Sequence, residues 1–268
     1  MTPAYALLFA LAASLALGFA GWVASLVRRD VSLVDSLWSL MILAAAVVSV
    51  WLGPGAGERA GWLIALAALW GVRLSAHITW RGWGKPEDRR YQAIRARNQP
   101  NFALKSAYLV FGVQAFLAWI VALPLMAAAQ SSAPATWLDP AGAALVLFGI
   151  AWESVADWQL ARFSRTRTPE AVLDTGLWRF SRHPNYFGEF CVWWGFWLIA
   201  LGAGAWWSVV SPALMSVLLM RISGVPMLEA GIAARRPAYR DYAERTPAFF
   251  PGPKRASQGR GSGRETRC

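Results

Sequence analysis

The sequence predicts an all-α, polytopic integral membrane protein with about seven transmembrane helices. Hydrophobic residues make up 56% of the 268 residues, whereas only 15% are charged. Apolar runs of about 20 residues, the length of a helix that spans a bilayer, recur along the chain. Lysine and arginine gather in alternate connections between these runs, which is typical of a protein with a fixed orientation in a membrane.

Seven apolar runs define the predicted helices: 5–27, 34–52, 60–80, 106–128, 141–160, 186–203 and 206–220. The first run has no basic segment before it and no cleavage site after it, so it is interpreted as a retained span. The last two runs are short and are separated by Gly-Ala-Gly, which favours a tight helical hairpin. Because little polar sequence separates the runs, residues 1–251 are predicted to form one domain. The basic tail, 252–268, is predicted to be disordered.

The charge pattern predicts the orientation. Of the 26 basic residues, 24 lie in alternate connections, Arg59 lies in an opposite one and Arg73 falls within a run. With seven spans, this places the N-terminus outside and the C-terminus in the cytoplasm. The net charge of +11 therefore reflects topology rather than nucleic-acid binding. The two cysteines and two histidines do not cluster, so no metal site is expected.

Several charged residues fall inside the apolar runs, where they are costly unless they serve a site. Asp35 begins the second run; it is either an acid favoured by the helix dipole or an acid that faces a buried cavity. Arg73 and His77 share one helical face. Arg73 either pairs with Asp35 or Glu153 or lines a ligand chamber.

Two further groups of charges lie next to apolar runs. Glu153 and Asp157 share a helical face just before Arg162, Arg165 and Arg167. They form either a surface ion-pair cluster or a site in which acids bind ligand hydroxyls and arginines bind phosphates. The segment 87–91 is predicted to be a loop. It is either a solvated loop or the carrier of a functional Tyr91.

The most informative stretch reads Gly-Leu-Trp-Arg-Phe-Ser-Arg-His-Pro-Asn-Tyr-Phe-Gly-Glu, residues 176–189. Pro184 fits the first turn of a helix. Asn185 and Glu189 then share one face, and a helix N-terminus beside arginines suits a phosphate-bearing ligand. Near the C-terminus, Tyr239 and Tyr242 are three apart, which indicates an interfacial helix, a ligand-binding turn, or both.

This stretch, followed by two runs and a Glu…Tyr-x-x-Tyr…Pro ending, resembles the steroid 5-alpha-reductase-like membrane family, which is related to the delta-14 sterol reductases. The resemblance covers about 153–251 and extends more loosely to Asp35 and the 81–97 loop. It implies a helical membrane enzyme in which NADPH enters from the cytoplasm and binds without a Rossmann domain. Residues 1–128 would then be substrate-side helices and 141–251 the cofactor-binding half.

The resemblance also implies a set of site residues. Asn185 would hold the nicotinamide end of NADPH, with Tyr186 and Glu189 nearby. The ribose, the phosphates and the closure of the site would involve Asp157, Arg162, Arg165, Arg167, Arg179, Arg182, His183, Arg221, Glu229, Arg236, Tyr239 and Tyr242. On the substrate side, Asp35 takes the place of the family's glutamate, and either Tyr91 or Trp70 takes the place of its tyrosine.

These residues predict an NADPH-dependent oxidoreductase that reduces the carbon-carbon double bond of a lipophilic enone, a 3-oxo-delta-4 steroid or similar isoprenoid. Asp35 and Tyr91 would be the catalytic pair that stabilises the enolate oxygen. The alternatives are an S-adenosylmethionine-dependent methyltransferase acting on a lipid or prenylated thiol, and a non-catalytic sterol- or lipid-binding protein. We expect a monomer in membrane lipid, in the inner membrane if the source is bacterial, with the cofactor site facing the cytoplasm.

Overall fold

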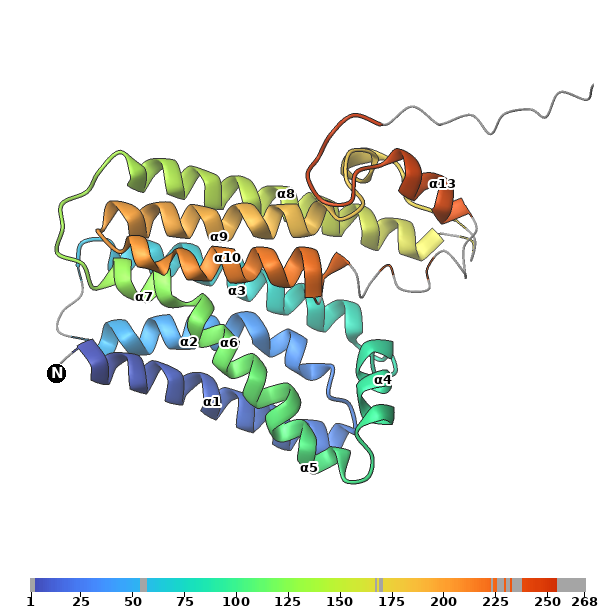
Figure 1. The fold of residues 1–268 in the computed structure, drawn as a ribbon, viewed down its shortest axis with the longest axis horizontal. Coiled ribbons are helices and arrows are strands. Elements are labelled where there is room, and N and C mark those ends of the chain that lie inside the picture. The colour runs from blue at the N-terminus through green and yellow to red at the C-terminus, as the bar shows by residue number, and fades with distance from the viewer. Residues whose placement is uncertain are drawn as a thin grey trace, which may run out of the picture. The chain divides into compact units, whose positions relative to one another are not determined.

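The computed structural model describes residues 3–53, 57–166, 168, 171–222, 224–225, 229, 232 and 238–254. Throughout these ranges the regular structure is helical, with no strand (Figure 1). The all-α prediction is therefore confirmed for the described residues. The chain divides into two compact units: unit 1 comprises residues 1–150 and 190–217, and unit 2 comprises residues 151–189 and 218–268.

A helix covers most of each predicted apolar run. The long single helices are α1 (Pro3–Arg28), α2 (Leu33–Leu52), α3 (Ala60–Gly82), α8 (Leu138–Thr166) and α9 (Pro184–Gly202). The other two runs are divided into shorter pieces: α5 (Phe102–Ser106), η1 (Ala107–Gly112), α6 (Val113–Val121) and α7 (Leu123–Ala129), then η3 (Trp206–Val209), α10 (Val210–Val217) and η4 (Leu218–Ile222). Pro184 begins α9, as a proline that lacks a backbone N–H favours.

The predicted loop at 87–91 is wrong from residue 89 onward, because α4 (Arg89–Arg97) begins there. Asp88 is the N-cap of this helix, and its carboxylate accepts a hydrogen bond from the backbone N–H of Arg90 at 2.9 Å. Such a cap satisfies one of the backbone donors that a helix leaves unpaired at its start. The charged composition of the segment hid a short amphipathic helix with Tyr91 on its buried face.

Five described helical stretches are long and apolar enough to cross a membrane: Ala4–Arg28, Leu33–Leu52, Ala60–Gly82, Phe102–Val121 and Leu138–Thr166. A shorter apolar stretch follows at Trp206–Ile222. These helices are consistent with a membrane protein. The finer prediction of seven spans needs both of the last two apolar runs to cross as well.

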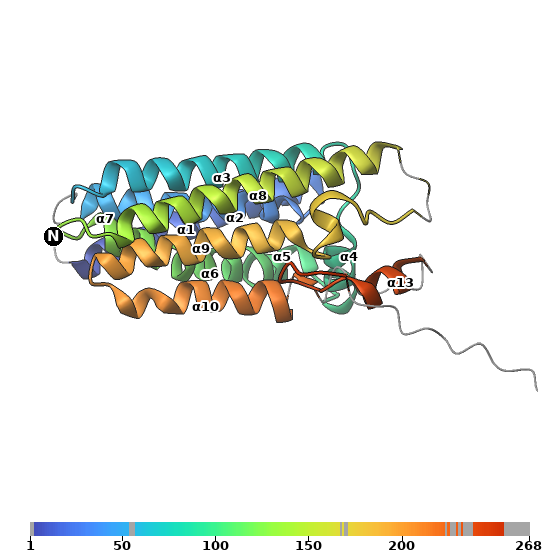
Figure 2. The same cartoon turned by 90° about the horizontal axis from the view of Figure 1, so that it is seen from above.

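In unit 1, α2 is the central helix: it packs against α1, α3, α6 and α7 (Figure 2). Its contact with α3 is close because Ser39 faces Gly71, and the Ser39 hydroxyl donates to the Gly71 carbonyl at 2.7 Å. Ser14 of α1 similarly donates to the Met41 carbonyl at 3.0 Å. Small residues and side-chain hydrogen bonds of this kind are how helices associate in a membrane, where apolar burial alone supplies little drive.

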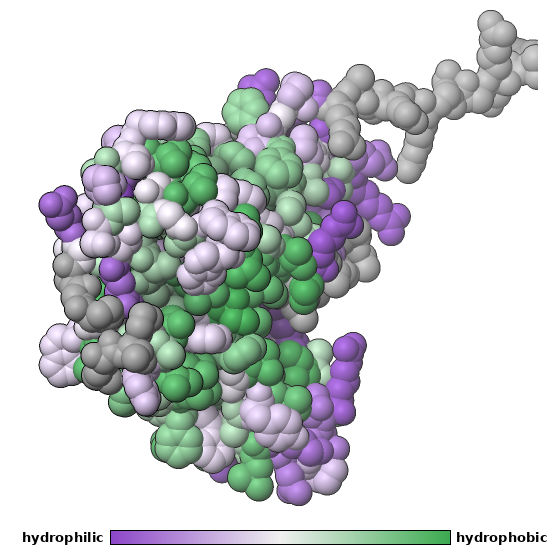
Figure 3. Space-filling view, turned by 60° about the vertical axis from the view of Figure 1, so that its left-hand side comes forward, coloured by the Kyte–Doolittle hydropathy of each residue, from purple (hydrophilic) through white to green (hydrophobic). Residues whose placement is uncertain are grey.

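The outward faces of the unit 1 helices carry large apolar side chains. Leu8, Phe19, Leu69, Tyr108 and Phe116 are each between 48% and 63% exposed, and broad apolar areas are visible on the surface in Figure 3. Exposed apolar surface on this scale is unfavourable in water but suits contact with lipid. The helices also satisfy their backbone hydrogen bonds internally, as a bilayer requires.

The connections of unit 1 alternate between two ends, and its basic residues follow them. The α1–α2 turn, α4 and the start of α5 lie at one end, whereas the end of α2 and the start of α3 lie at the other (Figure 1). Arg28, Arg29 and the seven basic residues of 81–105 therefore share one end. This is the segregation expected from the sequence for unit 1.

At the opposite end, Arg59 and Asp139 form a buried ion pair. The Arg59 Nε lies 2.5 Å from Asp139 Oδ1, and the two side chains are 3% and 7% exposed. The Arg59 guanidinium also donates to the carbonyls of Ala133 and Pro134 at 2.6 and 2.7 Å. Asp139 accepts in turn from the backbone N–H of Thr136 at 2.7 Å. One guanidinium thus fixes the 133–136 connection against the start of α3.

Replacing Arg59 with Gln should lower the free energy of unfolding by about 3–5 kcal/mol, because Asp139 would stay buried without its cation. Thermal unfolding of the detergent-purified protein measures the loss. Arg97→Gln is the matched control, since Arg97 is exposed. Equal unfolding temperatures for the two variants would contradict this assignment.

Candidate functional site

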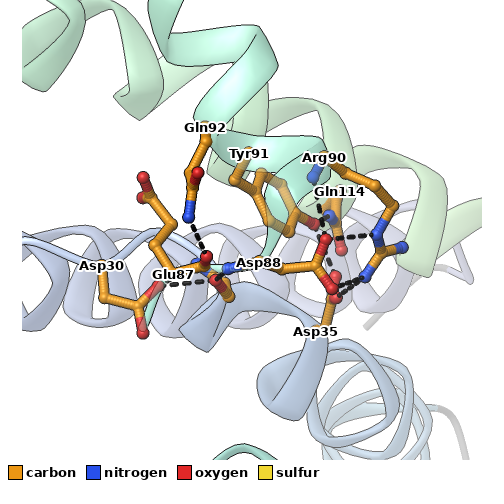
Figure 4. Close-up of polar contacts among 9 residues, drawn as sticks. Asp30, Asp35, Glu87, Asp88, Arg90, Tyr91, Gln92 and Gln114 are labelled. Atoms are coloured by element: carbon orange, nitrogen blue, oxygen red, sulfur yellow. Dashed lines mark hydrogen bonds and ion pairs between the residues drawn. The ribbon is translucent and has the colours of Figure 1, made fainter. Parts of the chain in front are cut away.

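The first polar cluster lies in unit 1, where α4 is hydrogen-bonded to the start of α2 (Figure 4). The Tyr91 hydroxyl donates to Asp35 Oδ1 at 2.5 Å. The Arg90 guanidinium donates to Asp35 Oδ2 at 2.7 Å. Both oxygens of the Asp35 carboxylate are therefore acceptors, and the structure brings together the two residues that the sequence proposed as a catalytic pair.

Arg90 links two carboxylates. Besides Asp35, its Nε donates to Asp88 Oδ1 at 3.0 Å. Burial alone would raise the pKa of Asp88, but hydrogen bonds from Arg90 outweigh it and the pKa is lowered. Burial likewise opposes the charge of Arg90, yet the two carboxylates raise its pKa further above the usual range. Arg90 is thus a permanent cation held between two acids.

Tyr91 is the buried proton carrier of this cluster. Its side chain is almost fully enclosed, and burial followed by the charge of Asp35 raises its pKa well above the usual value of 10.0. The amide Nε2 of Gln114 donates to the Tyr91 oxygen at 3.0 Å. At neutral pH the tyrosine therefore keeps its proton, with the donor direction set by Asp35 and the acceptor direction set by Gln114.

Arg90 and Gln114 were not among the predicted site residues. Gln114 is a polar side chain within an apolar run, which is a signal that sequence reasoning could have used. Arg90 directly precedes Tyr91, but nothing in the sequence shows that it pairs with a residue of α2.

A second layer of contacts attaches the start of α4 to the α1–α2 turn. The Val31 N–H donates to Glu87 at 3.0 Å, and the Asp88 N–H donates to the Ser32 hydroxyl at 2.8 Å. Arg95 pairs with Glu87 at 2.7 Å. Burial opposes the ionisation of Glu87, but this hydrogen bond lowers its pKa on balance. Tyr91 is thereby carried on a helix whose start is bonded to the α1–α2 turn at two points.

Trp70, the alternative aromatic residue, is in the core instead. Its side chain is fully buried and lies edge-on to Trp193, with ring centroids 5.1 Å apart. Of the two candidates, Tyr91 is therefore the one beside Asp35. Arg73 and His77 lie one turn apart in α3 and are both half-buried.

Unit 2 contains the second polar cluster and is held by backbone contacts. It comprises the end of α8, η2 (Gly176–Arg179), the start of α9, and α13 (Ala238–Arg245) with the residues after it. The Ser181 hydroxyl donates to the Phe249 carbonyl at 2.7 Å, and the Arg182 N–H donates to the Pro247 carbonyl at 2.9 Å. Tyr242 donates to the Trp178 carbonyl at 2.7 Å. These bonds join the 176–183 segment to the C-terminal segment.

The first residues of the predicted tail make contacts within unit 2. The Gly252 N–H donates to the Phe180 carbonyl at 3.0 Å, and Lys254 forms an ion pair with Asp174 at 3.4 Å. Backbone pairing with the 176–183 segment therefore continues past the last predicted ordered residue. Residues 255–268 lie outside the described part of the chain.

Glu229 is the centre of the charged cluster in unit 2. One of its oxygens lies 2.9 Å from His183 Nε2 and 3.0 Å from Arg182 Nε. The Tyr239 hydroxyl donates to the same oxygen at 3.0 Å. Burial opposes the charge, but these partners outweigh it and lower the pKa of Glu229. Burial and the neighbouring Glu229 charge raise the pKa of Tyr239. Three predicted cofactor residues, Arg182, His183 and Tyr239, therefore contact a fourth, Glu229.

Asn185 lies in the first turn of α9, and its Nδ2 donates to Asp157 at 3.3 Å. Its Oδ1 is buried without a hydrogen-bond donor in the described part of the chain. Tyr186 stacks on His183, with ring centroids 5.6 Å apart and planes 9° apart. Asp157 and Glu189 are both buried.

The other arginines predicted for the cofactor site lie outside the Glu229 cluster. Arg162, Arg165, Arg179 and Arg221 are exposed, with Arg162 over the ring of Trp158 and Arg179 over that of Phe180. Arg167 and Arg236 lie outside the described residues. Tyr242 is buried and bonded to backbone carbonyls, so its observed contacts tie unit 2 together.

The fold and the two clusters define a helical membrane-type protein with a polar cluster at one end of its apolar helices. Comparison with known proteins assigns a family: residues 21–246 match the model of a family described as "Protein of unknown function (DUF1295)". The match covers most of the chain, so the protein belongs to this family. The family is associated with steroid 5-alpha-reductase-like proteins.

One relative is an uncharacterized protein of the fission yeast Schizosaccharomyces pombe. It is 25% identical over 269 residues, a match that covers 89% of this chain and 77% of the relative. No solved structure matches the chain.

Replacing Glu229 with Gln should lower the free energy of unfolding at neutral pH by about 1–3 kcal/mol, which is measured as a lower unfolding temperature. The pKa of Glu229 is below its unfolded value of 4.5, so its contribution is complete above that value and is lost as the pH falls through the folded pKa. The difference in unfolding temperature between wild type and variant should therefore become smaller toward acid pH. Glu244→Gln, at an exposed position, is the control; a gap independent of pH would contradict the cluster's role.

Proposed function

We propose that this protein is an NADPH-dependent reductase of the carbon-carbon double bond of a lipophilic enone, such as a 3-oxo-delta-4 steroid or a similar isoprenoid. The observation that carries the proposal is the Tyr91 hydroxyl, which is buried, protonated and held at 2.5 Å by Asp35. A substrate carbonyl requires a donor of this kind as negative charge develops on its oxygen. The association of the family with steroid 5-alpha-reductase-like proteins supports the same chemistry.

The residues of unit 2 fit NADPH in two respects. Asn185 Oδ1 is a buried acceptor that could receive the N–H of a carboxamide. The exposed guanidinium groups of Arg162 and Arg179 are suited to phosphates. The Glu229 cluster would orient Arg182 and His183 rather than leave them available. When bound, NADPH would supply the hydride for the beta carbon.

The chain's own contribution follows from the Asp35 cluster. Before the substrate binds, the Tyr91 hydroxyl is oriented by Asp35 and Gln114, and Arg90 holds the second oxygen of Asp35. On substrate binding, the single Tyr91 proton would turn from Asp35 to the substrate carbonyl and stabilise the enolate oxygen. A proton from solvent would complete the reduction at the alpha carbon. The surrounding apolar helices would admit a lipophilic substrate and exclude water.

The proposal includes seven spans, with the basic end of unit 1 and the cofactor residues in the cytoplasm. The excess of lysine and arginine at one end supports this orientation. The protein would act as a monomer in the membrane.

The deciding experiment compares the thermal stability of the purified protein with NADPH, NADH and S-adenosylmethionine. A ligand at about 100 times its dissociation constant adds roughly 2.7 kcal/mol to the folded state. Stabilisation by NADPH together with oxidation of NADPH by added enone supports the proposal. Stabilisation by S-adenosylmethionine alone indicates a methyltransferase, and lipid binding without any cofactor effect indicates a non-catalytic protein.

Replacing Tyr91 with Phe should lower turnover of the enone by about 10²–10³, because a buried donor to the developing oxyanion is lost. The stabilisation by NADPH should remain. Tyr108→Phe is the control, since Tyr108 is 60% exposed on the apolar surface. Normal turnover by Tyr91→Phe would remove Tyr91 from the mechanism.

Replacing Asn185 with Ala should weaken NADPH binding about tenfold, because one hydrogen bond between uncharged groups of the protein and the cofactor is lost. Titration calorimetry or ligand-induced stabilisation measures the change. Asn98→Ala, in the turn after α4, is the control variant. An unchanged affinity of Asn185→Ala for NADPH would contradict the assignment of Asn185 to the cofactor site.

A further inference from the structure

The end of unit 1 that carries α4 has an unbalanced surface charge. Three of its acids are already paired: Asp35 and Asp88 with Arg90, and Glu87 with Arg95. Asp30 accepts hydrogen bonds from Ser32. Six further basic residues are exposed and form no ion pair within the described ranges: Arg28, Arg29, Arg81, Lys85, Arg89 and Arg97. The net effect is a cationic rim around the ends of apolar helices.

A groove with aromatic walls opens within this rim. It is lined by Ala76, Thr79, Trp80 and Trp83 at the end of α3 and has a volume of about 530 Å³. Trp80 and Trp83 are 52% and 69% exposed. The Arg28 guanidinium, from the end of α1, lies over the Trp83 ring at 5.5 Å from its centroid. The groove thus combines apolar walls with a stacked cation.

This combination matches a phospholipid rather than a small soluble anion. Tryptophan side chains prefer the level of the lipid headgroups, where one edge is apolar and the other is wet. A guanidinium stacked on an indole keeps its N–H donors directed outward, in a planar arrangement that suits phosphate. The apolar wall below it is suited to the first part of an acyl chain.

The opposite end of unit 1 provides an internal comparison. Trp51 and Trp137 are 82% and 76% exposed there, so aromatic surface occurs at both ends. Arg59, however, is buried in its ion pair with Asp139 and offers no charge to a headgroup. An exposed cation and exposed indole rings therefore occur together only at the α4 end of unit 1 among the residues compared. This predicts that anionic lipids are preferred at that end.

We propose that the Trp80–Trp83 groove, with Arg28 at its rim, binds an anionic phospholipid of the adjoining leaflet. The phosphate would contact Arg28, and the acyl chain would lie along Trp80 and Trp83. The site is independent of the proposed reductase activity, because it uses neither Asp35 nor Tyr91 nor any residue of unit 2.

Native mass spectrometry of the purified protein with phosphatidylglycerol or phosphatidylcholine tests the proposal. Wild type should retain phosphatidylglycerol in preference to phosphatidylcholine. Arg28→Gln should reduce this preference about fivefold, the effect of one cation near an anionic lipid. Trp83→Ala should lower retention of phosphatidylglycerol, whereas Trp51→Ala and Trp137→Ala should not. Arg28→Lys keeps the charge and should restore much of the preference without the stacking.

Thermal unfolding of each variant shows whether it is folded, and Arg28→Gln carries the test if Trp83→Ala does not fold. Equal retention of the two lipids by wild type would overturn the proposal. So would equal losses in Trp83→Ala and the two control tryptophan variants. Excess inorganic phosphate should leave lipid retention unchanged; displacement by phosphate would identify a soluble-anion site instead.

Discussion

The ion pair between Asp35 and Arg90 determines how the polar end of unit 1 is built. A carboxylate at the start of an apolar helix is costly without a partner, and α4 provides that partner together with the Tyr91 hydroxyl. Arg90 also bonds to Asp88, which is the N-cap of the same helix. The pairing of Asp35 and the start of α4 therefore depend on the same guanidinium. The buried tyrosine is positioned as a consequence. Its proton stays in place because burial and the adjacent carboxylate both oppose phenolate formation.

Two other clusters in the described residues also pair buried charges with several partners. At the far end of unit 1, Arg59 and Asp139 form a buried ion pair, and Arg59 also donates to backbone carbonyls of the adjoining connection. In unit 2, one carboxylate oxygen of Glu229 contacts Arg182, His183 and Tyr239. Arg59, Asp139 and Glu229 thus each have several hydrogen-bond partners, which is the condition under which buried ion pairs are tolerated. The exposed cations that remain unpaired in unit 1 lie on the α4 end, where a membrane surface would meet them.

The proposed chemistry places different demands on the two clusters. A donor to an enone oxygen must be positioned before the reaction. The Tyr91 oxygen is positioned by its bonds to Asp35 and Gln114, and its O–H would turn from Asp35 to the substrate. A cofactor site must accept a large charged ligand, and unit 2 accordingly keeps several arginines on its surface while its loop 176–183 is bound to the C-terminal segment. Membership of the DUF1295 family is shown by the sequence match, whereas the reductase activity is our proposal.

The sequence by itself determined the helical spans of unit 1 and the basic character of one end, because the length of an apolar run and the spacing of lysine and arginine are local properties. It also singled out Asp35, Tyr91 and Asn185 as polar residues that needed an explanation. It did not reveal α4, since a strongly charged segment resembles a solvated loop until its cap and its buried tyrosine are seen. Nor did it reveal the partners: Asp35 and Arg90 are 55 residues apart, and Arg59 and Asp139 are 80 apart. Such pairings depend on which helix ends meet in space, and that was decided by the packing of α2 among its neighbours.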